Sequence, residues 1–385
     1  MTGSGGGAEA PKARVLLLIK GLGLGGAERL LSESIPWLDR SRYEYEVCYL
    51  TPWKDDVVPH FEGAGITVHC LDVRRDASPR NLSRLRRFLH EHRFDVIHTH
   101  SPFPSALTRL LAPRDEVVIH TEHSLPGSRN LVTRMANRLT YPWCDLVISV
   151  SGVVDAAVRW GRIFRPRATR VIHGGVDDAL LRGRDPEERA RVLAGLGVPE
   201  GDLVVGNVAH LRRQKGHETW LRSAAAILDG FPDTTFVIVG REKEAGFQRS
   251  LEELAATLGI ASRVRFAGFQ DDPYPFMASF DVFLMASDFE GFPIALVEAM
   301  ALGVPVVATD VGGVGEALGP GSSRQTAPAG DWAGLAKRVA ELLGDDALRR
   351  SLAEAARDRM RSEFTIESMV SSVEGAYTEL LGAGA

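Results

Sequence analysis

The chain has 385 residues, of which 44% are hydrophobic and 25% charged, and its formal net charge at pH 7 is −5. These proportions are those of an ordinary globular protein with room for two domains, so disordered and fibrous classes are excluded. The negative charge gives no general reason to bind nucleic acid, and no nucleic-acid partner is expected. The sequence contains no run of about 18 apolar residues and no apolar signal-peptide core. We therefore expect a cytoplasmic protein, either free or peripheral to a membrane.

Three cysteines, Cys48, Cys70 and Cys144, are widely spaced within apolar runs. An odd number at such spacing suggests neither a disulfide framework nor a metal knuckle. All three are predicted to be buried thiols.

Short Val- and Ile-rich runs alternate with longer amphipathic stretches along the whole chain. The first series lies at 14–20, 45–50, 66–71, 95–100, 116–121, 145–150 and 169–173, and the second at 203–209, 235–239, 264–267, 281–286 and 304–308. This alternation predicts an α/β protein with two doubly wound parallel sheets, that is, two Rossmann-like domains in sequence.

The domain boundaries follow from local composition. Residues 1–12 are predicted to be a disordered tail, 13–178 a first domain and 179–363 a second, with a polar, Gly-containing hinge at His173–Asp177. The segment 364–385 has apolar residues at helical spacing, so we expect a helix that returns to pack on the first domain. Ligands of open α/β sheets bind beyond the carboxyl ends of strands, so two facing sheets would form one deep cleft.

A glycine-rich turn, Gly21 to Gly26, follows the first strand and opens a helix. It contains G-x-G-x-x-G, but the second strand ends Tyr49-Leu50-Thr51 without the acidic residue of a dinucleotide site, which argues against hydride transfer. Its amides can approach a phosphate or sugar closely. A tight strand-to-helix turn without a ligand is the alternative.

Histidines gather at two strand ends, in Ile97-His98-Thr-His100 and Ile119-His120-Thr-Glu122-His123. The spacing lacks the further ligands of a zinc site, so we expect His98 and His120 to be buried and hydrogen-bonded. His123, followed by a loop with Pro and Gly, is the candidate for a group that touches substrate.

A basic loop, His210-Leu-Arg212-Arg-Gln-Lys215, follows strand 203–209. Arg212 and Lys215 can face a diphosphate and stabilise the charge that builds on a leaving nucleoside diphosphate. An ordinary solvated basic loop is the alternative.

The stretch Glu290 to Glu298 runs from a loop into an apolar helix. Eight helical residues rotate two turns plus about 80°, so the two carboxylates cannot share a helix face and Glu290 must precede the helix. Pro293 suits the first helical position, which would leave the N–H groups of Ile294, Ala295 and Leu296 free to cradle a phosphate, while Glu298 accepts from a diol such as ribose. A simple capped helix is the alternative. Farther on, consecutive glycines at Gly312-Gly313 are expected to allow close approach to a ligand.

Taken together, these segments resemble the retaining family 4 glycosyltransferases, whose GT-B architecture sets two Rossmann-like domains around a cleft. The likeness covers about residues 14–382 and is strongest at Glu290-Gly-Phe-Pro-Ile-Ala-Leu-Val-Glu298, which looks like the family's E-x7-E motif. Gly21–Glu28 resembles its glycine loop and Leu211–Gly216 its phosphate-binding segment. His210 and His173 depart from it, since the family usually has Arg and Asn there.

The resemblance implies a transfer of a sugar from a nucleotide-sugar donor to a hydroxyl acceptor, with retention and without a metal or other cofactor. It implies Glu298 on the ribose, Glu290 near the sugar hydroxyls, and His123 near the reaction centre. It places Arg212 and Lys215 on the diphosphate with Gly25 and Gly26 beside it. The implied donor loop comprises Gly291, Phe292, Pro293, Ile294 and Ala295.

No residue stands out as a nucleophile, so the expected mechanism is same-face attack in which a diphosphate oxygen takes the acceptor proton. Two alternatives remain: a nucleotide-sugar epimerase or hydrolase of the same fold, which would need no acceptor, and a non-catalytic nucleotide-sugar-binding protein. The nucleotide, the sugar, the acceptor and the oligomeric state stay open.

Two basic segments, 74–93 and 129–138, lie in the predicted acceptor domain. The first also carries Leu82, Leu85, Phe88 and Leu89 at helical spacing. Contact with an anionic membrane surface is one interpretation, and solvated helix faces are the other.

Overall fold

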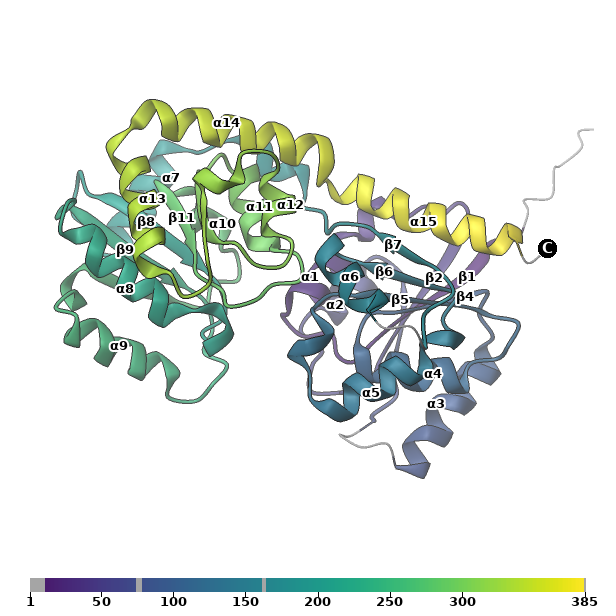
Figure 1. Cartoon of the computed structure of the whole chain (residues 1–385). Helices are drawn as coiled ribbons and strands as arrows, with labels where there is room; N and C mark the ends of the chain where they lie inside the picture. Colours follow the sequence, from purple (N-terminus) through teal and green to yellow (C-terminus); the bar gives the residue numbers. More distant parts are fainter. Residues whose placement is uncertain (1–10, 74–77, 161–163, 384–385) are drawn as a thin grey trace, which may run out of the picture. The chain divides into compact units, whose positions relative to one another are not determined.

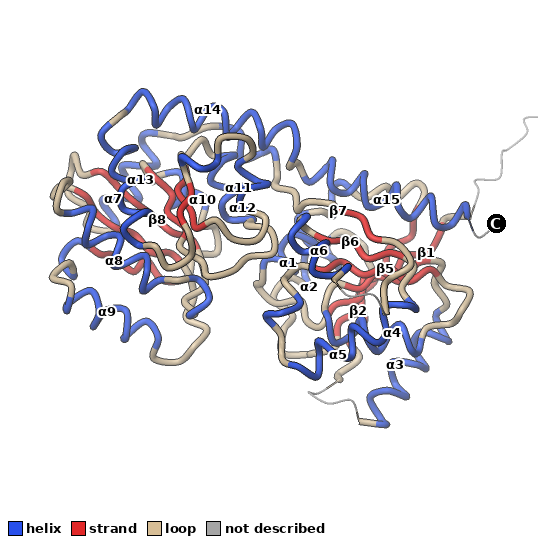
Figure 2. Tube along the Cα trace, in the orientation of Figure 1, coloured by secondary structure: helices blue, strands red, loops and turns tan. Residues whose placement is uncertain are grey.

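The computed structural model describes residues 11–73, 78–160 and 164–383 (Figure 1). The predicted tail 1–12 and the arginines at 74 and 75 therefore fall largely or wholly outside the described residues. The described chain forms two compact units, each built on a parallel sheet (Figure 2). Unit 1 takes the residues up to Val150, Asp155–Ile172 and those from Val370, and unit 2 takes Ser151–Val154 and His173–Met369. The chain thus passes into unit 2 a few residues before the predicted boundary at 178.

Unit 1 contains a seven-stranded sheet of order β3-β2-β1-β4-β5-β6-β7, in which every pair is parallel. Its strands are β1 (Ala13–Ile19), β2 (Tyr43–Tyr49), β3 (Thr67–Cys70), β4 (Val96–Thr99), β5 (Val117–Glu122), β6 (Leu146–Ser149) and β7 (Thr169–Val171). Its helices are α1 (Gly26–Glu33), α2 (Val58–Gly63), α3 (Pro79–His92), α4 (Pro102–Leu111), α5 (Leu131–Thr140) and α6 (Gly152–Arg159), of which α6 begins in unit 2. Short 3-10 turns lie at Ile35–Trp37, Pro126–Ser128 and Tyr141–Trp143 (η3).

Unit 2 contains a six-stranded sheet of order β10-β9-β8-β11-β12-β13, again parallel throughout. Its strands are β8 (Leu203–Val208), β9 (Thr234–Val239), β10 (Val264–Gly268), β11 (Val282–Met285), β12 (Val306–Thr309) and β13 (Thr326–Ala327). Its helices are α7 (Pro186–Gly195), α8 (His217–Leu228), α9 (Phe247–Thr257), α10 (Tyr274–Ala278), α11 (Ile294–Ala301), α12 (Val314–Leu318), α13 (Trp332–Gly344) and α14 (Asp346–Glu363). Further 3-10 turns lie at Asp178–Arg182, Arg213–Lys215 (η5), Ala261–Arg263 and Ser322–Arg324.

The predicted α/β class with two doubly wound parallel sheets is confirmed, and each predicted strand run coincides with a strand. The sequence pattern missed β13, because two residues are too short for a period to show. The buried residues of β1, Leu16 and Leu18, pack with Leu85 and Phe88 of α3 in the core of unit 1. Trp220, Phe236 and Leu251 belong to the core of unit 2.

The last helix, α15 (Ile366–Ala383), begins in unit 2 and from Val370 belongs to unit 1. Its Tyr377 is 1% exposed, and the hydroxyl lies 2.6 Å from Nδ1 of His98. Its Glu374 accepts a hydrogen bond of 2.6 Å from the hydroxyl of Tyr45 in β2. Buried polar bonds therefore tie the end of the chain to two strands of the first sheet.

One prediction about the cysteines is wrong. Cys48 and Cys144 are buried as expected, but Cys70 is exposed. Cys70 is the last residue of β3, an edge strand, so no neighbouring strand covers it on one side.

Candidate functional site

The two candidate loops of unit 2 follow adjacent strands at the point where the strand order reverses. The basic loop comes after β8, the loop with Glu290 comes after β11, and these strands pair at the centre of the sheet. In open α/β sheets this reversal leaves a crevice at the carboxyl edge, where ligands bind. The topology therefore brings Lys215 and Glu290, which are distant in sequence, to one place.

An ion pair between a half-buried lysine and a buried carboxylate joins these loops. Nζ of Lys215 lies 2.7 Å from Oε1 of Glu290, and the hydroxyl of Ser287 donates to the same oxygen at 2.7 Å. Glu290 is 7% exposed. Its other oxygen, Oε2, has no hydrogen bond within the described part of the chain. A desolvated carboxylate held this way can accept from a ligand hydroxyl through its second oxygen.

The basic loop is held in shape by hydrogen bonds to the neighbouring loop. The side-chain amide of Gln214 donates to the carbonyl of Phe289 at 2.8 Å, and its backbone carbonyl accepts from the amide of Asp288. Gly216 has φ +64°, and a Cβ there would lie 1.8 Å from the carbonyl oxygen of Ala286. Only glycine fits this crossing of the two loops.

Arg212 immediately precedes the turn η5 and is half-buried. Its Nε is buried and has no hydrogen-bond partner among the described residues. An unpaired buried donor on a guanidinium is costly, so an anion bound at this loop would relieve that cost. Arg213, in contrast, points outward and pairs with the exposed acids Glu218 and Glu244.

Glu298 lies on α11, and Glu290 lies in the loop before it, as predicted. Glu298 is 6% exposed and accepts a hydrogen bond of 3.1 Å from the hydroxyl of Tyr274. Sequence reasoning missed Tyr274, because nothing near it in the chain marks it as a partner of α11. Ser287 was within the quoted stretch but was given no role.

The predicted phosphate cradle at the start of α11 needs correction. Pro293 is the residue before the helix, not its first residue. The amide of Ile294 donates to the carbonyl of Phe292, and that of Leu296 donates to the carbonyl of Pro293. Two of the three amides expected to be free are thus used inside the turn, because the first turn closes with short-range bonds.

The side chains of the predicted donor loop are packed into unit 2. Phe292 is 8% exposed, and its ring centre lies 5.0 Å from that of His173. A Cβ added to Gly174 would lie only 2.5 Å from Cδ1 of Ile294, so Ile294 packs closely against Gly174. Gly291 uses its carbonyl to accept from Ser151 and from Gly313. In this loop, then, the side chains of Phe292 and Ile294 pack against neighbouring residues and fix the backbone.

The glycines at 312 and 313 are required by close packing within unit 2. Gly312 has φ +54°, and a Cβ there would lie 1.9 Å from the carbonyl oxygen of Glu290. A Cβ on Gly313 would lie 3.0 Å from the carbonyl oxygen of Gly291. What approaches these glycines is the Glu290 loop itself. Glu316, just beyond, accepts from His173 at 2.9 Å and from the amide of Gly152.

The glycine loop of unit 1 also lies where the strand order reverses, between β1 and β4. Gly21 is required by packing, since a Cβ would lie 2.6 Å from Oγ1 of Thr51. Gly25 precedes α1, and a Cβ there would meet the carboxylate of Glu28. Gly26 is exposed, and nothing lies within 4 Å of its Cβ position. The open approach to this turn is therefore at Gly26.

The histidines at the ends of β4 and β5 form one buried cluster. His98 bonds Tyr377 and Thr121, and His120 lies 2.8 Å from the hydroxyl of Ser105, so both are buried and hydrogen-bonded as predicted. Burial lowers the pKa of His98 to about 3. Sequence reasoning gave His100 no role, but its Nδ1 lies 3.2 Å from Nε2 of His123.

His123 is half-buried in this cluster, and burial lowers its pKa to about 4. It is thus neutral at pH 7, where it can donate or accept a hydrogen bond but carries no charge. The bond to His100 fixes which side of the ring remains for another partner.

Glu122 is fully buried beside this cluster and forms a two-pronged ion pair with Arg129. Burial alone would raise the pKa of Glu122, but its bonds to His120 and Arg129 outweigh burial and lower the pKa to about 2 from an ordinary 4.5. A carboxyl whose folded pKa is depressed contributes stability above its ordinary pKa and loses it as pH falls toward the folded value.

We expect the advantage in unfolding free energy of the wild type over Glu122→Gln to be constant at neutral pH and to shrink between pH 4.5 and about 2. Denaturant titrations at a series of pH values measure it. Glu379→Gln, which removes an exposed carboxylate paired with Arg170, is the control and should show little such change. If the difference in unfolding free energy between the wild type and Glu122→Gln did not depend on pH, the pKa of Glu122 would not be lowered in the folded state.

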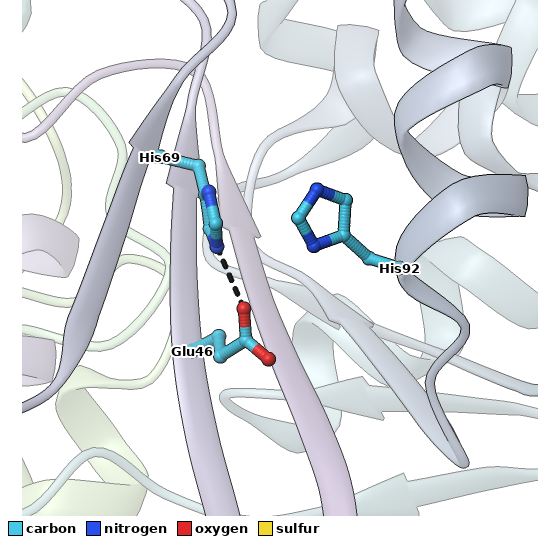
Figure 3. A group of neighbouring side chains, drawn as sticks. All are labelled: Glu46, His69 and His92. Carbon is cyan, nitrogen blue, oxygen red and sulfur yellow. Dashed lines mark hydrogen bonds and ion pairs between the residues drawn. The ribbon is translucent and has the colours of Figure 1, made fainter.

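A separate group of possible metal ligands lies in unit 1. One ligand atom each from Glu46 of β2, His69 of β3 and His92 of α3 lies within 4.8 Å of the others (Figure 3). Nε2 of His69 lies 2.6 Å from Oε2 of Glu46, and Arg14 pairs with the other oxygen. Arg14 already neutralises this carboxylate, so a cation would have to compete with a guanidinium. The contacts fit an ion-pair network that joins β1, β2 and β3.

Two family models match the chain: Glycosyltransferase Family 4 over residues 24–180 and Glycosyl transferases group 1 over residues 189–359. The chain is 31% identical over 295 residues to a phosphatidyl-myo-inositol mannosyltransferase of Mycobacterium leprae, a match that covers 75% of each protein. The chain is a family 4 glycosyltransferase.

This glycosyltransferase is also 26% identical over 312 residues to the N-acetyl-alpha-D-glucosaminyl L-malate synthase of Bacillus anthracis, with 78% of each chain covered. Among solved structures, Anabaena HepE in complex with UDP and glucose superposes with a TM-score of 0.83 at 23% identity, over 95% of this chain and 100% of the other. The fold is GT-B, as the sequence resemblance implied. The Lys215–Glu290 pair lies within the region matched by the group 1 model.

Proposed function

We propose that this family 4 glycosyltransferase moves a sugar from a nucleotide-sugar donor to a hydroxyl acceptor, with retention of configuration and without a metal. The observation that carries the proposal is the ion pair of Lys215 with the buried Glu290 at the strand-order reversal of unit 2, with Glu298 on the following helix. A cation, a carboxylate with an open oxygen and a second buried carboxylate are suited to a phosphate, a sugar hydroxyl and a ribose diol. HepE was solved with UDP and with UDP-glucose, so a UDP-sugar is the first donor to test.

In the proposed reaction the bond from the anomeric carbon to the diphosphate oxygen breaks, and the acceptor oxygen bonds to the same face of that carbon. The acceptor proton passes to a diphosphate oxygen. Lys215 and Arg212 stabilise the negative charge that develops on the leaving group. Glu290 orients the ammonium of Lys215 before the donor arrives.

In unit 1, the neutral imidazole of His123 can offer a hydrogen bond to a substrate, and Gly26 exposes its backbone at the glycine loop. Neither of these two contacts requires the protein group to gain or lose a proton at pH 7. Product analysis by NMR tests retention: the anomeric configuration of the donor sugar must persist in the product. An Ala variant that is rescued by azide and traps an inverted glycosyl azide would replace same-face attack with a protein nucleophile.

Thermal-shift measurements in EDTA, against a panel of nucleoside diphosphates and nucleotide sugars, test the donor site. We expect one nucleotide class to stabilise the wild type selectively, because a ligand at about 100 times its dissociation constant adds about 2.7 kcal/mol. Glu298→Ala should lose this shift. The control is Glu218→Ala, an exposed acid on α8. Donor turnover without acceptor would favour a hydrolase or epimerase, and binding without any turnover a sensor.

A further inference from the structure

Helix α5 has its polarity reversed relative to an ordinary surface helix. Its apolar residues face outward: Leu131 is 60% exposed, Val132 79%, Met135 47% and Leu139 44%. Its buried residues are polar, Asn137 and Thr140. A surface helix normally packs its apolar side chains against the core. A row of exposed apolar side chains therefore indicates a surface that contacts a membrane or another molecule.

The inner side of α5 is held by hydrogen bonds. Arg109 of α4 donates to Oδ1 of Asn137 and to the hydroxyl of Thr140, each at 3.1 Å. Asn137 donates to the carbonyl of Pro102 at 2.9 Å. These buried polar bonds fix the helix to α4. The exposed apolar side chains are therefore not needed to hold it in place.

Neighbouring elements extend the exposed apolar surface. Leu110 of α4 is 57% exposed and Trp143 of η3 53%, and both elements pack against α5. Figure 1 shows α4 and α5 beside each other in unit 1. At the other side of α5, Arg138 donates to the carbonyl of Val158, two residues before the exposed Trp160. Exposed tryptophans are typical of residues that sit at a membrane interface.

The charge on this segment has one sign. From His123 to Cys144 the sequence contains Arg129, Arg134 and Arg138 and no Asp or Glu, in a chain whose net charge is −5. Arg129 pairs with the buried Glu122, while Arg134 is exposed on the same helix as the apolar residues. An apolar stripe flanked by arginines complements a surface with anionic head groups above an apolar layer.

The other basic segment, which contains α3, differs in the exposure of its apolar residues. In α3 the apolar residues Leu85, Phe88 and Leu89 are buried in the core, and Arg86 and Arg87 are exposed on the opposite side. This is an ordinary solvated helix face. The apolar stripe that a membrane contact needs is thus exposed in α5 and covered in α3.

We propose that the α5 face, defined as Leu131, Val132, Met135 and Leu139 with Arg134, docks on an anionic lipid bilayer. The apolar side chains enter the interface, and Arg134 lies among the lipid phosphates. In the described residues no helix is long and apolar enough to cross a membrane, so the contact is peripheral. A second copy of the chain fits this face less well, because a symmetric contact would bring the same arginines together without a carboxylate on the segment.

Vesicle co-sedimentation of the full chain tests the proposal, with phosphatidylcholine vesicles and with vesicles that also contain phosphatidylglycerol. We expect binding to the anionic vesicles only, weakened by salt. Arg134→Gln should lower the partition coefficient about fivefold, because a basic residue near such a surface contributes about that factor. Leu131→Ser/Met135→Ser should lower it about tenfold or more. These side chains are exposed, so the variants should unfold at the wild-type midpoint.

Arg86→Gln/Arg87→Gln on α3 is the matched control, since it removes exposed arginines from a helix whose apolar face is covered. It should bind anionic vesicles nearly as the wild type does. Three results would overturn the proposal: no binding to anionic vesicles, binding that the α5 variants retain, or a wild-type dimer that Leu131→Ser/Met135→Ser converts to a monomer. None of these readouts depends on donor turnover, so they leave the proposed transfer reaction untouched.

Discussion

Lys215→Met should lower kcat about a thousandfold, the upper range for loss of one group that stabilises charge in a transition state. Met keeps the length and apolar stem of lysine but removes the ammonium that pairs with Glu290 at 2.7 Å. The leaving diphosphate then loses a cation, and Glu290 is left buried without its ion-pair partner. Initial rates with the donor identified by thermal shift give the measurement.

Arg213→Met is the control for Lys215→Met. Arg213 lies two residues away in the same turn, but its side chain is 75% exposed, pairs with the surface acids Glu218 and Glu244 and lies over the ring of Phe247. We expect its rate to stay within a few-fold of the wild type. The double variant Lys215→Met/Glu290→Gln separates two effects, because it removes the stranded carboxylate charge. Its stability should recover toward the wild type while its activity stays low. Full activity in Lys215→Met would refute the role of Lys215.

Gly312→Ala should destabilise unit 2 by about 3 kcal/mol and also reduce donor binding. The residue has φ +54°, which costs an L-residue about 1–2 kcal/mol, and its Cβ would lie 1.9 Å from the carbonyl oxygen of Glu290. Backbone, unlike a flexible side chain, can yield only by moving the loop that carries the carboxylate. Urea unfolding gives the stability, and the thermal shift with nucleotide gives the binding.

Gly315→Ala, three positions along, is the comparison for Gly312→Ala. Gly315 lies in α12, its φ is not positive, and its Cβ position is 3.5 Å from the nearest atom, Oδ1 of Asp310. We expect its stability to equal or slightly exceed that of the wild type, because Ala is the better helix former. If the two alanines were equally tolerated, the loop crossing would not be as tight as the structure has it.

The strands and the class of the fold could be read from the sequence because burial in a parallel sheet leaves a local signature. Runs such as 15–19 are apolar on both faces, since helices cover both sides of the sheet. The placement of Glu290 before the helix also followed from local geometry. Both features depend on residues close together in the chain.

The sequence could not show the features that depend on contacts between residues distant in the chain. Gly312 and a ligand-approach glycine have the same sequence pattern, and only the fold shows that the carbonyl of Glu290 fills the space. The pairing of Glu298 with Tyr274 likewise joins separate elements. The two basic helices α3 and α5 look alike as arginine-rich amphipathic segments, and tertiary packing alone decides which apolar face is exposed.

The placement of α15 has a consequence for synthesis on the ribosome. Unit 2 is complete once Met369 has been made, whereas unit 1, whose strands are synthesised first, lacks the partners of His98 and Tyr45 until Tyr377 and Glu374 emerge. Domains usually complete their folding in the order of synthesis. Here the first sheet to be synthesised waits for a helix that is made after unit 2, so a ribosome that stalls before Val370 would carry a complete unit 2 joined to an unfinished unit 1.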